Sequence, residues 1–124
     1  MNFSNSSLNK LFNAFKPAFN GIGIAFKSER NLRFHSIAMG CVIIFSFVLS
    51  ISIIEWMIVL ILFALVIAME LINTSIEKLC DLIQPGKNER IRIIKDISAG
   101  AVLWVAIVAF MAGLLIFLPK IFTF

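Results

Sequence analysis

The sequence has few charged residues and none of the short motifs with which soluble enzymes bind nucleotides or zinc. No stretch resembles GxxxxGK[ST], the glycine-rich loop of protein kinases or HExxH, which excludes the soluble nucleotide-binding and zinc-hydrolase sites that these motifs build. Charged residues make up only 15% of the 124 positions, whereas hydrophobic residues make up 60%. These values lie outside the range of soluble globular proteins and indicate an integral membrane protein.

Cysteine is also scarce. The two cysteines, Cys41 and Cys80, have no metal-like spacing, and each lies in or beside an apolar run. They are interpreted as small packing residues. The net charge of +4 does not indicate nucleic-acid binding, because the basic residues cluster beside apolar segments, where they set orientation and contact anionic lipid.

Long apolar runs predict an all-α integral membrane protein, with one domain over residues 1–124. Each run is long enough, at 1.5 Å per residue, to cross a hydrocarbon core of about 30 Å. The predicted spans are residues 36–54, 57–76 and 97–118. Over residues 8–29 apolar side chains recur every three or four positions with lysines between them, which predicts an amphipathic helix on the membrane surface. Pro17 is expected to kink or interrupt this helix.

Basic residues are absent between the first and second spans, and this asymmetry predicts the orientation of the chain. Five Lys and Arg residues precede the first span, five lie in the polar loop predicted over residues 78–95, and one follows the third span. The positive-inside rule therefore places the N-terminus and this loop in the cytoplasm and the C-terminus outside.

The second span ends in a row of polar side chains. At 100° per residue, Glu70, Asn73, Glu77 and Asp81 share one helical face, which Thr74 joins. A carboxylate in or beside hydrocarbon costs several kcal/mol unless it is paired, binds metal or faces a wet cavity. The row therefore needs a partner or a function.

Six of the seven acids and ten of the eleven basic residues lie near the inner interface. Carboxylates that hold Mg²⁺ against phosphates, beside lysines that offset charge, suit phosphoryl transfer. Glu70 and Glu77 are separated by about 10 Å along the helix axis, so one could meet a lipid head group and the other a nucleotide.

The spacing of these carboxylates is also compatible with two other functions, a proton-coupled transporter and a purely structural polar contact between helices. Small multidrug-type transporters need four spans and a carboxylate near mid-membrane. This sequence has three spans, and its acids gather at one interface.

Several motifs resemble those of the bacterial diacylglycerol kinase family, which are small integral-membrane lipid kinases. The run from Glu70 to Asp81, followed by Lys95, Asp96 and the small residues 99–102, is similar to the family's pattern. The segments ERNLRFH, SIIEWMI and IFLPK resemble the branch that phosphorylates undecaprenol in Gram-positive bacteria. The resemblance implies a homotrimer in the bacterial cytoplasmic membrane, with active sites shared between neighbouring subunits.

The resemblance also implies a role for each matched residue. Glu70 falls on the family's catalytic base, with Asn73 beside it, and Glu29 and Glu77 fall on the carboxylates that hold the Mg²⁺ of ATP. Lys95 and Asp96 fall on the pair that contacts ATP. The other matched positions are Lys87 and Asn88 near the nucleotide, Pro17 beside the adenine, Lys10 near phosphate and lipid, and Ala99 near the lipid head group.

The activity expected from this resemblance is transfer of the ATP γ-phosphate to a primary lipid alcohol. Glu70 would accept the hydroxyl proton, and Lys95 would offset the charge that develops on the transferred group. Both undecaprenol and diacylglycerol remain candidates for the lipid.

Overall fold

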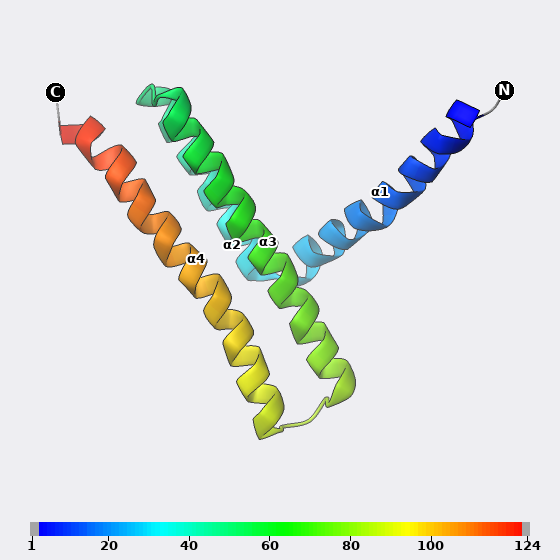
Figure 1. Cartoon of the computed structure of the whole chain (residues 1–124). Helices are drawn as coiled ribbons and strands as arrows, with labels where there is room; N and C mark the ends of the chain where they lie inside the picture. Colours follow the sequence, from blue (N-terminus) through cyan, green and yellow to red (C-terminus); the bar gives the residue numbers. More distant parts are fainter. Residues whose placement is uncertain (1–2, 123–124) are drawn as a thin grey trace.

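Four helices make up the part of the chain that the structure describes, residues 3–122, and no strand occurs within that range. In the computed structural model they are α1 (Phe3–Ser28), α2 (Arg30–Val48), α3 (Ile53–Ile83) and α4 (Glu89–Phe122) (Figure 1). The prediction of an all-α fold is confirmed. Residues 1–2 and 123–124, which the single-domain prediction also includes, lie outside the described residues.

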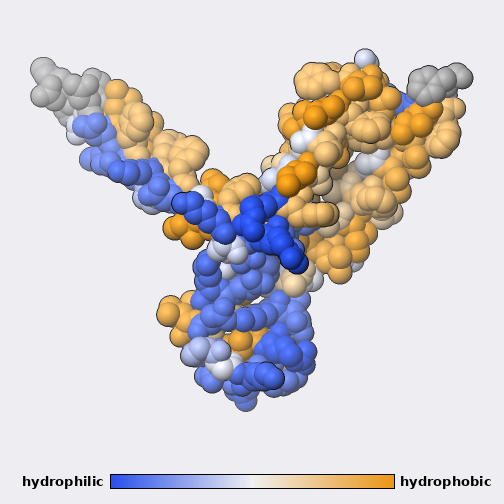
Figure 2. Space-filling model, turned by 180° about the vertical axis from the view of Figure 1, so that it is seen from behind, coloured by the Kyte–Doolittle hydropathy of each residue, from blue (hydrophilic) through white to orange (hydrophobic). Residues whose placement is uncertain are grey.

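The central helix is α3, which packs along α4 and also contacts α2. The first helix, α1, contacts only α2 and α3 and leaves the bundle at a wide angle (Figure 1). Each of α2, α3 and α4 is long and apolar enough to cross a membrane, as predicted, although α2 ends at Val48 instead of residue 54. Figure 2 shows hydrophobic residues over the bundle and hydrophilic residues gathered where α3 connects to α4. The bundle thus has one apolar end and one polar end.

A capping box fixes the turn between α2 and α3. Ser52 Oγ accepts a hydrogen bond from the backbone N–H of Glu55 at 3.2 Å, and Glu55 Oε1 accepts one from the Ser52 N–H at 2.9 Å. Glu55 Oε1 also pairs with Lys120 Nζ at 3.0 Å. These contacts join the start of α3 to the end of α4, beside the apolar cluster of Ile51, Val59 and Ile116. They lie at the end of the bundle away from the polar residues.

A sharp turn at Glu29 separates α1 from α2. The Glu29 backbone is extended, with φ −114° and ψ 114°, so the helix cannot continue through it. The Arg33 guanidinium donates to the carbonyls of Phe26 and Lys27 at 2.6 and 3.0 Å, which satisfies backbone groups at the end of α1. The turn holds Glu29 where α1 meets the bundle.

Two helices continue past prolines, contrary to the sequence prediction. Pro17 was expected to kink or interrupt this helix, and the interruption does not occur, because α1 is one helix. Proline removes a single backbone hydrogen bond, and this part of α1 is exposed, so solvent can satisfy the carbonyl that loses its partner. Pro119 likewise lies inside the last turns of α4, which ends at Phe122 instead of residue 118.

The connection between α3 and α4 is much shorter than the loop predicted over residues 78–95. Since α3 runs to Ile83 and α4 begins at Glu89, only residues 84–88 lie between them. Asn88 starts α4 early, because its Oδ1 accepts the backbone N–H groups of the next helical turn at 2.9 and 3.2 Å. Most of the charged residues assigned to a loop are therefore helical.

Candidate active site

The polar face of α3 is centred on a buried carboxylate. Glu70 is only 2% exposed, and Asn73 and Thr74 on the same face are also buried. The hydroxyl of Thr74 donates to the backbone oxygen of Glu70 at 2.9 Å. The sequence prediction that one face of this helix carries polar groups out of water is confirmed for these three residues.

His35 on α2 is the side-chain partner of Glu70. Its Nε2 lies 3.2 Å from Glu70 Oε1, a contact that is an ion pair when the imidazole is protonated. The side chain of His35 is 27% exposed and that of Glu70 only 3%, so the imidazole is partly accessible whereas the carboxylate is buried. His35 was not among the predicted site residues, because a single histidine at a membrane edge gives no sign of which helix it faces.

A second polar contact joins α3 to α4. Ser98 Oγ donates to Asn73 Oδ1 at 2.7 Å, and Asn73 Nδ2 donates to Glu77 Oε1 at 3.3 Å. The asparagine amide therefore has its oxygen turned toward α4 and its nitrogen toward Glu77. This places Glu77 in a defined hydrogen-bonded position one turn beyond Asn73.

Glu29 and Glu77 lie close enough to Glu70 to act on it electrostatically. The α1–α2 turn thus brings a third carboxylate toward the polar face of α3. Within residues 3–122, no three His, Cys, Asp or Glu side chains come together closely enough to hold a metal ion alone. Two carboxylates nevertheless fit Mg²⁺, which typically takes one or two protein carboxylates and completes its six oxygens with phosphates and water.

Four of the predicted nucleotide-binding residues line one hollow at the α3–α4 connection. Its volume is about 650 Å³, and its walls include Lys87, Asn88, Lys95 and Asp96. Arg92, which also lines it, pairs with Asp96 at 3.0 Å. Basic side chains and backbone groups around an open hollow suit phosphate oxygens.

Lys95 connects this hollow to α3. Its Nζ lies 2.5 Å from Asp81 Oδ1, and the lysine side chain is 36% exposed. Asp81 is therefore a partner of Lys95, the residue expected to offset phosphate charge. The pair fixes the direction in which the ammonium group points.

Three predicted site residues lie apart from the Glu70 group. Lys10 and Pro17 are exposed on the part of α1 that extends away from the bundle (Figure 1). Ala99 is exposed on α4, and its buried neighbour Ser98 is the residue that contacts Asn73. Ser98 was not among the predicted site residues. One chain alone therefore does not assemble every predicted residue.

The sequence profile described as prokaryotic diacylglycerol kinase matches residues 16–117, which include the buried carboxylate and the hollow. The chain belongs to the prokaryotic diacylglycerol kinase family. The undecaprenol kinase of Bacillus subtilis (strain 168) is 41% identical over 116 residues, which cover 94% of this chain and 94% of that relative. The diacylglycerol kinase of Synechocystis sp. (strain ATCC 27184 / PCC 6803 / Kazusa) is 34% identical over 109 residues, 87% of this chain and 62% of that relative.

Replacing Ser98 by alanine tests the contact that joins α4 to the polar face. The substitution leaves the buried Asn73 Oδ1 without this donor, so the free energy of unfolding should fall by about 1 kcal/mol. Unfolding in mixed detergent and SDS micelles measures this difference. Ser75→Ala, at an exposed position on α3, is the matched control and should change stability by less than about 0.5 kcal/mol. Equal losses in the two variants would contradict the contact.

Proposed function

We propose that this chain is an ATP-dependent kinase that phosphorylates a membrane lipid alcohol, either undecaprenol or diacylglycerol. Membership of the prokaryotic diacylglycerol kinase family and the names of both relatives support a lipid kinase. The mechanism rests on the burial of Glu70 on an apolar helix. Asn73, which is also buried, lies next to it on the same face and closer to the polar end of the bundle.

Glu70 is the general base of this proposal. The lipid hydroxyl oxygen forms a bond to the γ-phosphorus, the bond from that phosphorus to the β–γ bridging oxygen breaks, and ADP leaves. The hydroxyl proton passes to a Glu70 carboxylate oxygen. Asn73, hydrogen-bonded to Ser98 and Glu77, orients the groups beside this carboxylate.

Glu29 and Glu77 are the residues that would hold Mg²⁺, which neutralises phosphate charge when it is bound. Lys95 lies on α4 in the hollow and offsets the charge that develops on the transferred group. Lys87, Asn88 and Asp96 contact ATP in the same hollow. Because Asn88 already caps α4 through its Oδ1, its amide nitrogen is the group that remains for a phosphate oxygen.

The protein is proposed to lie in the bacterial cytoplasmic membrane with α1 on the surface. Figure 2 shows hydrophilic residues along one side of α1 and hydrophobic residues along the other, which supports an interfacial position. The α3–α4 connection, with the N-terminus, is assigned to the cytoplasm and the C-terminus to the outside, because ten of the eleven Lys and Arg residues flank the inner end. This orientation exposes the hollow to cytoplasmic ATP.

A homotrimer with shared active sites is proposed as the working form. Its structural support is that α1, which carries Lys10 and Pro17, extends away from the bundle (Figure 1). A neighbouring copy could bring its α1 to the site, where Lys10 would contact phosphate and lipid and Pro17 would flank the adenine. Ala99, exposed on α4, would then meet the lipid head group.

A proton-coupled transporter and a structural polar contact are the alternatives. A structural role accounts for the Ser98–Asn73 and Lys95–Asp81 contacts, which tie α3 to α4. A structural role does not explain why a carboxylate is buried at position 70, because an apolar residue there would avoid the free-energy cost of burying a charged group. A transporter carboxylate would be expected near mid-membrane, whereas the carboxylates near Glu70 lie toward the polar end.

An assay of lipid phosphorylation by the purified protein distinguishes the kinase from the two alternatives. Incubation with γ-labelled ATP, Mg²⁺ and either undecaprenol or diacylglycerol should give labelled phosphate in the extracted lipid, with comparable enzyme in parallel reactions. The relative rates identify the preferred lipid. Proton-driven uptake in vesicles without ATP turnover would favour the transporter, and absence of labelled lipid from both reactions would contradict the kinase.

The metal role predicts a change in Mg²⁺ dependence when Glu77 becomes glutamine. The variant keeps the side-chain shape but loses one of two carboxylate ligands, so half-maximal activity should need on the order of tenfold more Mg²⁺. Glu55→Gln, at the opposite end of the bundle, is the control and should keep the wild-type requirement. An unchanged Mg²⁺ requirement in Glu77→Gln would count against the assignment.

A further inference from the structure

The base proposed above holds a proton at the end of each turnover. Above neutral pH, ATP and a lipid alcohol give ADP, a lipid phosphate and one proton, and this is the proton that Glu70 takes from the hydroxyl. Glu70 must lose it before it can act again. Because Glu70 is only 2% exposed, its carboxyl group has little contact with water. A second group is therefore needed to carry the proton away.

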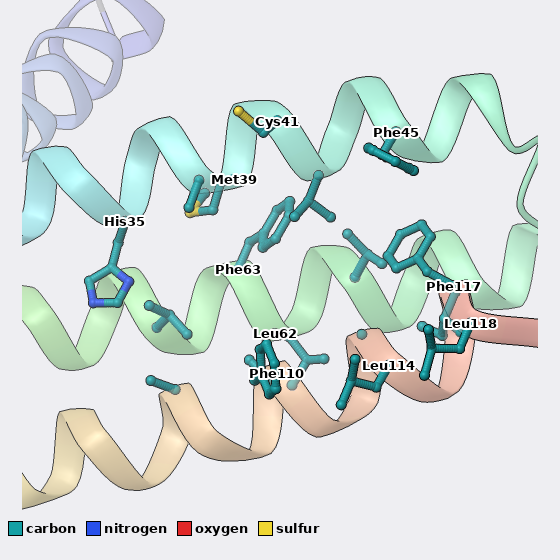
Figure 3. Close-up of a pocket in the computed structure, with 18 of the residues that line it drawn as sticks. His35, Met39, Cys41, Phe45, Leu62, Phe63, Phe110, Leu114, Phe117 and Leu118 are labelled. Atoms are coloured by element: carbon teal, nitrogen blue, oxygen red, sulfur yellow. The ribbon is translucent and has the colours of Figure 1, made fainter. Parts of the chain in front are cut away.

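The side chain of His35 is in position to take this proton. Its Nε2 lies 3.2 Å from Glu70 Oε1, which is within reach of direct proton transfer. Figure 3 shows the imidazole ring projecting from α2 toward α3, beside an open apolar groove between α2, α3 and α4. The side chain of His35 is 27% exposed. His35 thus contacts the buried carboxylate and is also accessible from outside the protein.

Histidine suits a proton relay better than other residue types. The other carboxylates that act on Glu70 electrostatically, Glu29 and Glu77, are proposed to hold Mg²⁺. A lysine or arginine beside Glu70 would keep its own proton at neutral pH, and an amide would donate a hydrogen bond without taking up a proton. Imidazole changes between its neutral and protonated forms near neutral pH, so it both accepts and releases protons.

The position of His35 along α2 brings the ring close to interfacial water. Arg33 lies two residues earlier, about 3 Å along the helix axis, and is exposed. Its guanidinium donates to two carbonyls at the end of α1, where the chain turns into the bundle. Charged side chains beside an apolar span mark the boundary between membrane and water. A proton on the imidazole therefore has a short path to water.

We propose that His35 relays the proton of each turnover from Glu70 to interfacial water. This inference rests on the proposed kinase activity and adds to it the step that restores the base. Neutral imidazole with its hydrogen on Nδ1 accepts the proton of the Glu70 carboxylic acid at Nε2, so one O–H bond breaks and one N–H bond forms. The imidazolium gives its Nδ1 proton to water, and exchange with water restores the first tautomer. Glu70 is again ionised for the next lipid hydroxyl.

Replacement of His35 by alanine and by glutamine separates the relay from a structural contact. Alanine removes the contact with Glu70, whereas glutamine keeps an N–H group that can donate to the carboxylate but takes up no proton. Both variants should therefore lower kcat for lipid phosphorylation by about 10- to 100-fold. The KM values for Mg·ATP and for the lipid should stay within about twofold of wild type. If glutamine restores kcat to within about twofold, His35 only holds the carboxylate and the relay is wrong.

Free imidazole gives a readout that a structural role would not change. His35→Ala leaves space beside an open groove of about 510 Å³, so imidazole from solution can reach Glu70. At constant pH and ionic strength, imidazole should raise kcat of this variant by about fivefold or more. Pyrazole, which has the same shape but is a far weaker base, should not. Equal increases with both compounds would indicate that the space is merely filled, and no increase with imidazole would contradict the relay.

Ile37→Ala is the matched control on the same helix. Ile37 is 70% exposed, so its truncation should keep kcat within about twofold of wild type and should give no response to imidazole. His35 variants that turn over as fast as an active wild-type protein would refute the relay alone. A wild-type protein that phosphorylates no lipid would instead refute the proposed function.

Discussion

A carboxylate buried on a membrane helix is the constraint on which the rest of this structure depends. An ionised group away from water costs several kcal/mol unless other groups compensate for it, and Glu70 is 2% exposed on the long apolar helix α3. Its compensation comes from α2, through the His35 imidazole at 3.2 Å. The position of α2 against α3 and the chemistry of the site are therefore linked by one contact.

The residues on the polar face of α3 lie at successive levels between the apolar part of the bundle and the α3–α4 connection. Glu70 is the most deeply buried charged residue of this face and contacts His35 on α2. Asn73 comes next and is fixed by Ser98 on α4. Glu77 lies one turn further, hydrogen-bonded to Asn73, and Asp81 pairs with Lys95 beside the hollow at the α3–α4 connection. A lipid alcohol from the membrane and a nucleotide from the aqueous side could thus approach the same helix face from opposite directions.

The fold was largely predictable from the sequence, because the helix periodicity and the length of apolar runs are local properties. The polar face of α3 follows from the same periodicity. The partners of that face were not predictable, since His35 and Ser98 come from other helices and their meeting with Glu70 and Asn73 depends on helix packing. The loop prediction failed for a similar reason: charged residues were taken as a break, although the Asn88 cap allows α4 to begin among them. Whether neighbouring copies complete the site is a property of the assembly, which one chain cannot specify.

The most direct test of the catalytic role proposed for Glu70 is the kinase activity of Glu70→Gln, measured together with its assembly. Glutamine has the same shape and still meets His35, but it cannot accept a proton at neutral pH. Labelled-phosphate transfer to the lipid should fall by about 10²- to 10⁴-fold, while the oligomer seen by size-exclusion chromatography in detergent stays the same as wild type. Near-normal turnover in a correctly assembled variant would contradict the role of Glu70 as the base.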